Sequence, residues 1–322
     1  GDATRLALTA AAIQLGSYAP SGAPVTTAVP GGTEATFNAH DIAISGNFTW
    51  NGFAVSQFSS KGEIHFDSTI NSAPNRTGGR NFSGQMTASG YLGFATARLS
   101  PSTYSDYRVD LTSDGSSSIA ITRLAGAVAG ASLAAGGRLE FAARTIDHSG
   151  TVTAPLGEIA FNAAGGTVTL GETSVTSVAA DQTMMLGQTD QSGRYWQFQS
   201  TSLNPQTKDL FSATYNVIKA PEKAILIDAA SSVVKTGAIL DLSAGGEAIA
   251  AEFTPGPGGK TDILAISPAS TEAAVIAANT TAKSVFAVLP GWNGQYAPQD
   301  SQAMGFYNVS NPIAVKASDG SV

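Results

Sequence analysis

The chain has no cysteine among its 322 residues, which excludes disulfide bonds, thiolate catalysis and cysteine-based metal sites. Charged residues make up only 13% of the chain, about half the usual share in soluble domains. The 17 Lys and Arg residues are scattered and form no basic stripe, so nucleic acid is not an expected partner. A surface covered by Ser, Thr, Asn, Gln and Gly instead is typical of secreted and cell-surface proteins.

Histidines and long apolar runs are also scarce. The three histidines, His40, His65 and His148, show no spacing typical of metal ligands, and we interpret them as polar residues on the outer faces of strands. No apolar run reaches the roughly 18–20 residues of a transmembrane helix, and no signal peptide is visible at the start. The sequence therefore predicts no metal and no cofactor, and we expect a mature product or a piece of a longer chain.

A short unit recurs instead, in which a glycine precedes alternating apolar or small residues. In Gly150-TVTA, Gly157-EIAF and Gly166-TVTL the second and fourth residues after the glycine are apolar or small, as in a half-buried strand. We expect each leading glycine to form a corner, because glycine adopts the positive φ of tight turns. The same unit begins at five further glycines: Gly46, Gly62, Gly84, Gly90 and Gly137.

The spacing of these units favours a repeated coil. Sixteen residues separate Gly46 from Gly62 and Gly150 from Gly166, and residues 35–50 align without gaps on residues 139–154 with six identities. A sandwich, a propeller and a β-solenoid all contain many short strands, but the Asn-Gly and Asp-Gly turns expected of propeller hairpins are scarce. A β-solenoid, whose coils of about 20 residues are joined by small-residue turns, fits best.

The predicted fold is therefore all-β, a right-handed parallel β-helix (β-solenoid) with irregular loop excursions near the C-terminus. We expect coils over residues 1–203, a loop excursion over 204–223, and further coils with Pro- and Gly-rich loops and an end cap over 224–322. Residues 267–284 could form a helix with Ser or Thr as its cap. The expected inward-pointing residues are Ile42, Ile64, Phe66, Leu139, Phe141, Val152, Ile159, Phe161, Val168 and Leu170.

Several longer pieces carry a family resemblance. They are GAILDLSAGGE, EFTPGPGGKTDIL and FAVLPG followed by YAP, together with GRLEFAARTIDHSGTVTAPLGEIAF and TVTLGETSVTSVA upstream. Over about two-thirds of the chain, these pieces resemble an internal or C-terminal section of large bacterial filamentous haemagglutinin-like exoproteins. The resemblance implies a right-handed parallel β-helix, export through a partner transporter of the outer membrane (two-partner secretion), and roles in adhesion, biofilm cohesion and surface fibres.

Two groups of carboxylates could serve a carbohydrate-active enzyme, because β-helix enzymes use clustered carboxylates with a basic residue. Asp106, Arg108 and Asp110 would share one face of a strand by alternation, which an ion-paired face explains more simply. Asp228 and Asp241 are 13 residues apart, too close to stack on adjacent coils. We therefore expect that the protein is not an enzyme.

Three aromatic residues, Trp196, Trp292 and Tyr296, could stack on sugars or on a partner, although such residues more often cap a core or pin a loop. The most consistent function is a non-catalytic structural or adhesive protein, secreted or on the bacterial cell surface, that forms a rod or fibre. The alternative is a polysaccharide lyase or hydrolase on the same fold. Because solenoid ends need a cover, the expected partners are copies of the chain or the remainder of a longer one. Glycans or a host surface are further candidates, and the resemblance adds the outer-membrane transporter.

Overall fold

The structure is a computed structural model, and it describes ten stretches of the chain. In these stretches the regular elements are all strands, and no helix there is long and apolar enough to cross a membrane. The expected helix at 267–284, the end cap, Trp292 and Tyr296 lie outside the described residues. Those residues are 5–17, 33–50, 52–70, 82–112, 114–132, 134–180, 182–189, 195–203, 210–217 and 222–251.

Most strands form a parallel solenoid with three faces, which we number in the order in which the chain visits them. Face 1 contains β1 (Arg5–Thr9), β3 (Glu34–Ala39), β5 (Val55–Ser60), β9 (Tyr91–Thr96), β12 (Ser118–Arg123), β14 (Thr145–His148) and the second halves of β16 (Glu158–Leu170) and β21 (Ala224–Val234). Face 2 contains β2 (Ala12–Ser17), the first half of β4 (Asp41–Trp50), β6 (Glu63–Asp67), β10 (Arg98–Pro101), β15 (Thr151–Thr153), β17 (Val175–Ser177) and β22 (Ile239–Asp241). Face 3 contains the second half of β4, β8 (Phe82–Ala88), β11 (Asp106–Asp110), β13 (Arg138–Ala142) and the first halves of β16 and β21.

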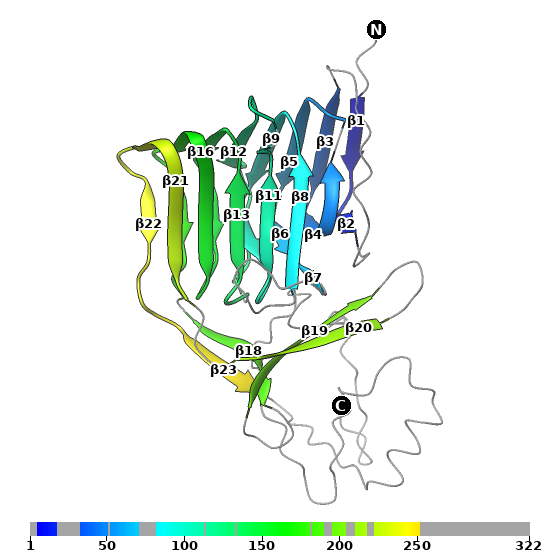
Figure 1. Cartoon of the computed structure of the whole chain (residues 1–322), viewed down its shortest axis with the longest axis vertical. Helices are drawn as coiled ribbons and strands as arrows, with labels where there is room; N and C mark the ends of the chain where they lie inside the picture. Colours follow the sequence, from blue (N-terminus) through cyan, green and yellow to red (C-terminus); the bar gives the residue numbers. More distant parts are fainter. Residues whose placement is uncertain are drawn as a thin grey trace, which may run out of the picture.

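The pairing between coils confirms the predicted fold class. All pairings that build the three faces are parallel, and Figure 1 shows β21, β16, β13, β11 and β8 side by side along face 3. Ala160 follows its ladder partner Glu140 by 20 residues, and Arg108 follows Gln85 by 23. The shortest coils are therefore longer than the 16-residue spacing of the glycines. The short strand β7 (Thr69–Ile70) pairs antiparallel with β8 beside this framework.

The core lies inside the three faces. The ten residues expected to point inward are all buried, with exposures of 0–1%. Parallel pairing places equivalent side chains of successive coils directly above one another. Phe37, Phe58 and Phe94 on face 1 form such a column, with ring centroids 4.9 and 5.6 Å apart. The alternation read from the sequence is therefore the alternation that fills the core.

Seven of the eight leading glycines lie at corners, but mainly for a reason other than the expected positive φ; Gly84 is an exception, because it lies inside β8 opposite Tyr107. Among the eight, Gly46 and Gly90 have positive φ, and Gly46 lies where β4 turns from face 2 to face 3. At Gly157 and Gly166 a Cβ atom would instead overlap the carbonyl oxygen of the neighbouring coil, at Gly137 and Arg144 respectively. Coils approach so closely at these corners that a side chain has no room.

The echo between residues 35–50 and 139–154 is not a coil repeat. Phe37 lies on face 1, whereas Phe141, its counterpart in the alignment, lies on face 3. Ile42 lies on face 2 and Ile146 on face 1. The echo therefore reflects the common pattern of one strand and its corner, which recurs on all three faces.

A second sheet interrupts the solenoid between β17 and β21. It contains β18 (Thr183–Thr189), β19 (Trp196–Leu203), β20 (Leu210–Asn216) and β23 (Glu247–Ala251), in the order β20-β19-β18-β23, and β19 pairs antiparallel with β20. This arrangement differs from the prediction, which had coils up to residue 203 and a loop over 204–223. The alternation in WQFQSTSL continues the strand pattern of the coils, so the sequence hides the change of sheet.

One coil lacks its face 2 strand. Between β12 and β13 the described residues of 124–137 form no strand, and β10 pairs directly with β15 through Leu99 and Val152. Part of this segment lies against the earlier coils: the Val128 N–H donates to the Lys61 carbonyl at 2.9 Å, and Arg98 donates to the Gly130 carbonyl at 2.8 Å. On face 2, β10 and β15 therefore pair with each other although the coil between them contributes no strand.

Candidate functional site

An ion-pair strip runs across the outer side of face 3. Register places Asp106 opposite Arg138, which in turn lies opposite Glu158, while Arg108 lies opposite Glu140. Alternation within each strand turns these side chains outward, and pairing between coils sets opposite charges next to each other. The strip consists of Asp106, Arg108, Asp110, Arg138, Glu140 and Glu158.

Two arginines hold the strip together. The Arg108 Nε lies 2.8 Å from Asp110 Oδ2, and its Nη1 lies 2.5 Å from Glu140 Oε1. Arg138 contacts Glu140 at 2.8 Å, Asp106 at 3.3 Å, and also Glu158. The prediction that Asp106, Arg108 and Asp110 share one ion-paired face is confirmed. The face is less exposed than expected, since the Asp106 and Glu140 side chains are only 1% and 5% exposed.

The electrostatics of the strip favour the charged forms of Asp110 and Arg138. Partial burial alone would raise the pKa of Asp110, but hydrogen bonds from the Thr112 hydroxyl and N–H, together with Arg108, hold that pKa below its usual value. Hydrogen bonding and charge from Glu158, with Asp106 and Glu140, outweigh burial and raise the pKa of Arg138. A sugar-cleaving pair needs one carboxyl with a raised pKa as its general acid, and Asp110 is shifted in the opposite direction.

A second group, the polar row, lies on the outer side of face 2 and was missed from the sequence. Its signal is the alternation in EIHFD, which turns Glu63, His65 and Asp67 to the same side of β6. On the next coil Arg98 pairs with Glu63, and Ser100 lies opposite His65. The polar row is defined as Glu63, His65, Asp67, Arg98, Ser100 and Ser102.

Ion pairs and hydrogen bonds join the polar row into two groups, one around Asp67 and one around Glu63. The His65 Nε2 lies 3.6 Å from Asp67 Oδ2, and Asp67 also accepts a hydrogen bond from Ser102. Glu63 accepts hydrogen bonds from Arg98 and, at 3.1 Å, from Ser100. A histidine beside a carboxylate is an arrangement that can orient a general base. The hydroxyls nearest to this pair donate to carboxylates rather than to the histidine, so no nucleophile is activated.

His148 does not lie on an outer face as predicted. Its side chain is fully buried in the core, between Ile121 and Leu170 in the face 1 column, and its ring stacks on Phe161 with centroids 5.4 Å apart. Burial lowers the pKa of His148 to about 4 and outweighs the opposing effect of the Val175 backbone. His148 points inward because side chains alternate along β14, so that His148 lies on the same side of the strand as the buried Ile146.

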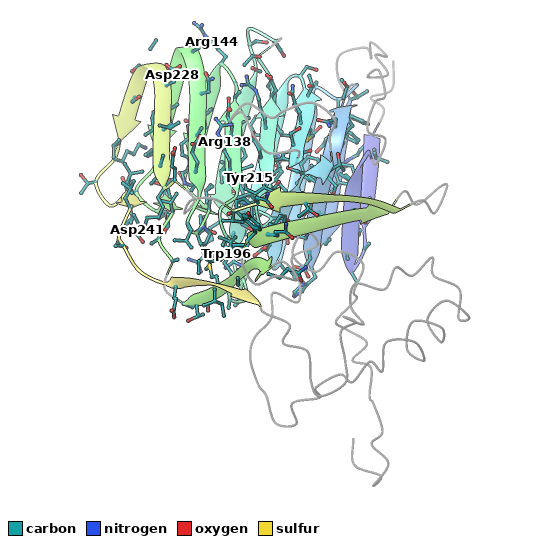
Figure 2. All side chains as sticks on the ribbon, turned by 60° about the horizontal axis from the view of Figure 1, so that its bottom comes forward. Arg138, Arg144, Trp196, Tyr215, Asp228 and Asp241 are labelled. Carbon is teal, nitrogen blue, oxygen red and sulfur yellow. The ribbon has the colours of Figure 1, made fainter. Side chains whose placement is uncertain are left out.

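Trp196 lies at the start of β19 and is half-buried. Its indole N–H donates to the Leu186 carbonyl, and its side chain packs against an apolar group that we name the corner cluster. Figure 2 shows Trp196 and Tyr215 on the hairpin of the second sheet. Trp196 is therefore held against the protein itself. The corner cluster consists of Tyr104, Ala135, Ala180, Met184, Leu186 and Phe198.

The remaining carboxylate candidates do not come together. Asp228 lies on face 3 and Asp241 on face 2, both in the last coil. Asp241 accepts hydrogen bonds from the Ser243 hydroxyl at 2.7 Å and N–H at 3.0 Å, and these bonds lower its pKa. In the part of the chain that the structure describes, no three His, Asp or Glu side chains are grouped so that they could hold a metal ion.

Comparison with known proteins adds no family to this picture. No protein-family model, no curated protein and no solved structure matches the chain. The resemblance to filamentous haemagglutinin-like exoproteins therefore stays a prediction from the sequence.

Proposed function

We propose that the protein is a non-catalytic structural or adhesive rod, secreted or exposed on a bacterial surface, that acts through its shape and repeated faces. The observation that supports this proposal most directly is the ion-pair strip. On the outer side of face 3, where β-helix enzymes could place reactive carboxylates, Arg108 and Arg138 pair with four acidic side chains. The ion pairs hold these side chains in place and neutralise part of their charge. A surface of this kind suits contact with a partner better than catalysis.

The expected setting follows the resemblance noted in the sequence. Export through an outer-membrane partner transporter, attachment to glycans or a host surface, and continuation by copies of the chain or by a longer chain are parts of the same proposal. The absence of cysteine is consistent with a chain that crosses a membrane unfolded and refolds outside.

An adhesion assay with a folding control tests this function. Beads coated with the folded protein are expected to attach to biofilm matrix and to cells, while beads coated with heat-unfolded protein are not. The variant His65→Ala is expected to attach as well as the original protein, because His65 lies on face 2, outside the ion-pair strip. Equal binding by folded and unfolded protein, or no binding at all, would contradict an adhesive rod.

The polar row supports a second candidate, a polysaccharide lyase or hydrolase on face 2. His65 beside Asp67, with Arg98 on the next coil, offers a base and a cation to an acidic sugar. Incubation with polygalacturonate and alginate, followed by the absorbance of unsaturated products and by reducing ends, tests it. Cleavage that is lost in Asp67→Asn but kept in Asp110→Asn would establish the enzyme and overturn the structural rod.

A further inference from the structure

The last of the described coils, β21 with β22, is far more exposed than the middle of the solenoid, as is β1 at the other end. Leu226, Val234 and Ile239 are 48%, 55% and 51% exposed. The described residues provide a neighbouring coil on one side only, through β16 and β17. Segments with few buried apolar contacts open locally at low free-energy cost, so an end coil of this kind needs another source of stability.

Both ends of this coil are fastened into the second sheet. The chain reaches β21 from β20, and it passes from β22 into β23, which pairs in parallel with β18 through Thr183–Glu247 and Met184–Ala248. Lys223, just before β21, donates to the Ser243 carbonyl just after β22 at 2.7 Å. The start of β21 and the end of β22 are therefore both connected to the second sheet, and the Lys223–Ser243 hydrogen bond holds them near each other.

The second sheet is in turn fixed to the solenoid through the corner cluster. The Tyr104 ring, between β10 and β11, lies 5.1 Å from Phe198 of β19 and 5.4 Å from Tyr215 of β20. Figures 1 and 2 both place the hairpin β19–β20 along the same side of the solenoid. Phe198 is 1% exposed, which makes it the central apolar contact between the hairpin and the coils.

The backbone at this contact is strained in two coils, those whose face 2 strands β10 and β15 pair directly. In the described ranges Tyr104 and Leu156 are the non-glycine residues with positive φ, at 55° and 52°. Each lies at a corner between face 2 and face 3, and Leu156 also packs against the corner cluster. A left-handed backbone is unfavourable for residues with a side chain and persists where surrounding contacts determine it. Both residues share the corner cluster, to which the second sheet contributes Met184, Leu186 and Phe198.

We propose that the second sheet is a clamp that holds the last coil in register on the solenoid. When the coil opens, its two ends stay pinned at β20 and β23, so the opened chain gains less conformational freedom than a free end would. The clamp thus acts as a noncovalent cross-link around β21 and β22. It thereby keeps β21 and β22 paired with β16 and β17, where the described solenoid ends.

Hydrogen exchange of the full chain tests the clamp. Phe198→Ala removes the central contact, and amides of residues 224–241 are expected to exchange roughly a hundredfold faster, the scale of a cross-link that closes a loop of this size. Amides of residues 139–171 serve as an internal reference and are expected to stay protected. Gln197→Ala is the matched control, because this neighbouring side chain bonds Asn216 on the exposed side of the hairpin and should leave both segments unchanged.

Tyr104→Gly attacks the same contact from the solenoid side, since it removes the ring and relieves the positive φ. It should free residues 224–241 as Phe198→Ala does, and it covers the case in which Phe198→Ala fails to fold. Exchange that accelerates in 183–217 but not in 224–241 would overturn the clamp. Equal acceleration in 139–171 would overturn it too, because the coil would then have no separate dependence on the second sheet.

Discussion

Ile159 and Ile225 are the same residue type at the same place in two successive coils, yet their surroundings differ. They are ladder partners on face 3, and Ile159 is fully buried whereas Ile225 is only partly so. Ile159 has a coil on each side, through Leu139 and Ile225, while Ile225 belongs to the last coil. Burial in a solenoid therefore comes from the number of neighbouring coils, and the sequence of a strand does not reveal it.

Truncation of this matched pair should give the largest difference. Ile159→Ala is expected to lower the free energy of unfolding by about 4 kcal/mol, because it leaves a cavity that neighbours on both sides cannot fill. Ile225→Ala should cost roughly half as much, since solvent already reaches its site. Urea unfolding followed by circular dichroism measures both. Equal losses would mean that the last coil is as well packed as the middle ones.

Lowering the pH should destabilise the middle of the solenoid, because His148 is buried there. The pKa of this side chain is about 4 in the folded protein, against about 6.5 when unfolded. Below pH 6.5 the unfolded chain takes up a proton that the folded chain refuses, so stability falls as the pH drops from 6.5 to 4, by about 3 kcal/mol in all. Unfolding measured at pH 7 and pH 4.5 checks this, with His148→Leu as the variant that should lose most of the dependence.

Corner glycines should show how tightly the middle coils approach. Gly166→Ala places a Cβ against the Arg144 carbonyl of the neighbouring coil, and we expect a loss of about 2–3 kcal/mol from the forced separation. Gly115→Ala is the control, because no atom lies within 4 Å of a Cβ built there. A melting temperature that falls equally in both variants would place the cost in the loss of glycine itself and not in the contact between coils.

Replacement of single carboxylates should have the smallest effect on stability, and the effect should be larger in the middle of the solenoid than in the last described coil. Asp110→Asn removes an ion pair with Arg108 in the strip, and we expect a loss of about 1 kcal/mol. Because the pKa of Asp110 is lowered, its contribution is present above the unfolded pKa near 3.9 and disappears as the pH falls through the folded value. Asp241→Asn in the last coil should leave the melting temperature unchanged. A larger loss at Asp241 than at Asp110 would reverse the comparison.

The sequence predicts the fold class because period-two alternation and small-residue corners are local features. The inward set from Ile42 to Leu170 can be read from single strands, without knowing which strands pair. Face and register depend on pairings between distant residues, such as Thr183 with Glu247, that no local pattern encodes. The 16-residue spacing of the glycines is not the length of a coil, because Gly150 and Gly166 lie at different corners.

The candidate site could be predicted only in part. The outward row Asp106, Arg108 and Asp110 follows from alternation, but its partners Arg138 and Glu140 come from a strand 32 residues further on. The row Glu63, His65 and Asp67 has the same local signal, but its partners Arg98 and Ser100 come from a strand 35 residues further on. His148 was misplaced because a histidine is ordinarily polar, although the alternation of β14 sets it in phase with Ile146; its neighbours Ile121 and Leu170 come from other coils.

The direct pairing of β10 with β15 has a consequence for how such a chain can change over evolutionary time. A strand can be dropped from one face, and the segment 124–137 can take its place, while the coils above and below still meet. Insertions and deletions at a corner then alter what the solenoid displays without shifting the phase of the strands that follow. The mostly exposed residues 128–132 of this segment, ahead of the buried Ala135, are accordingly the place where a foreign peptide could be inserted into this protein, and where natural variants should differ most in length.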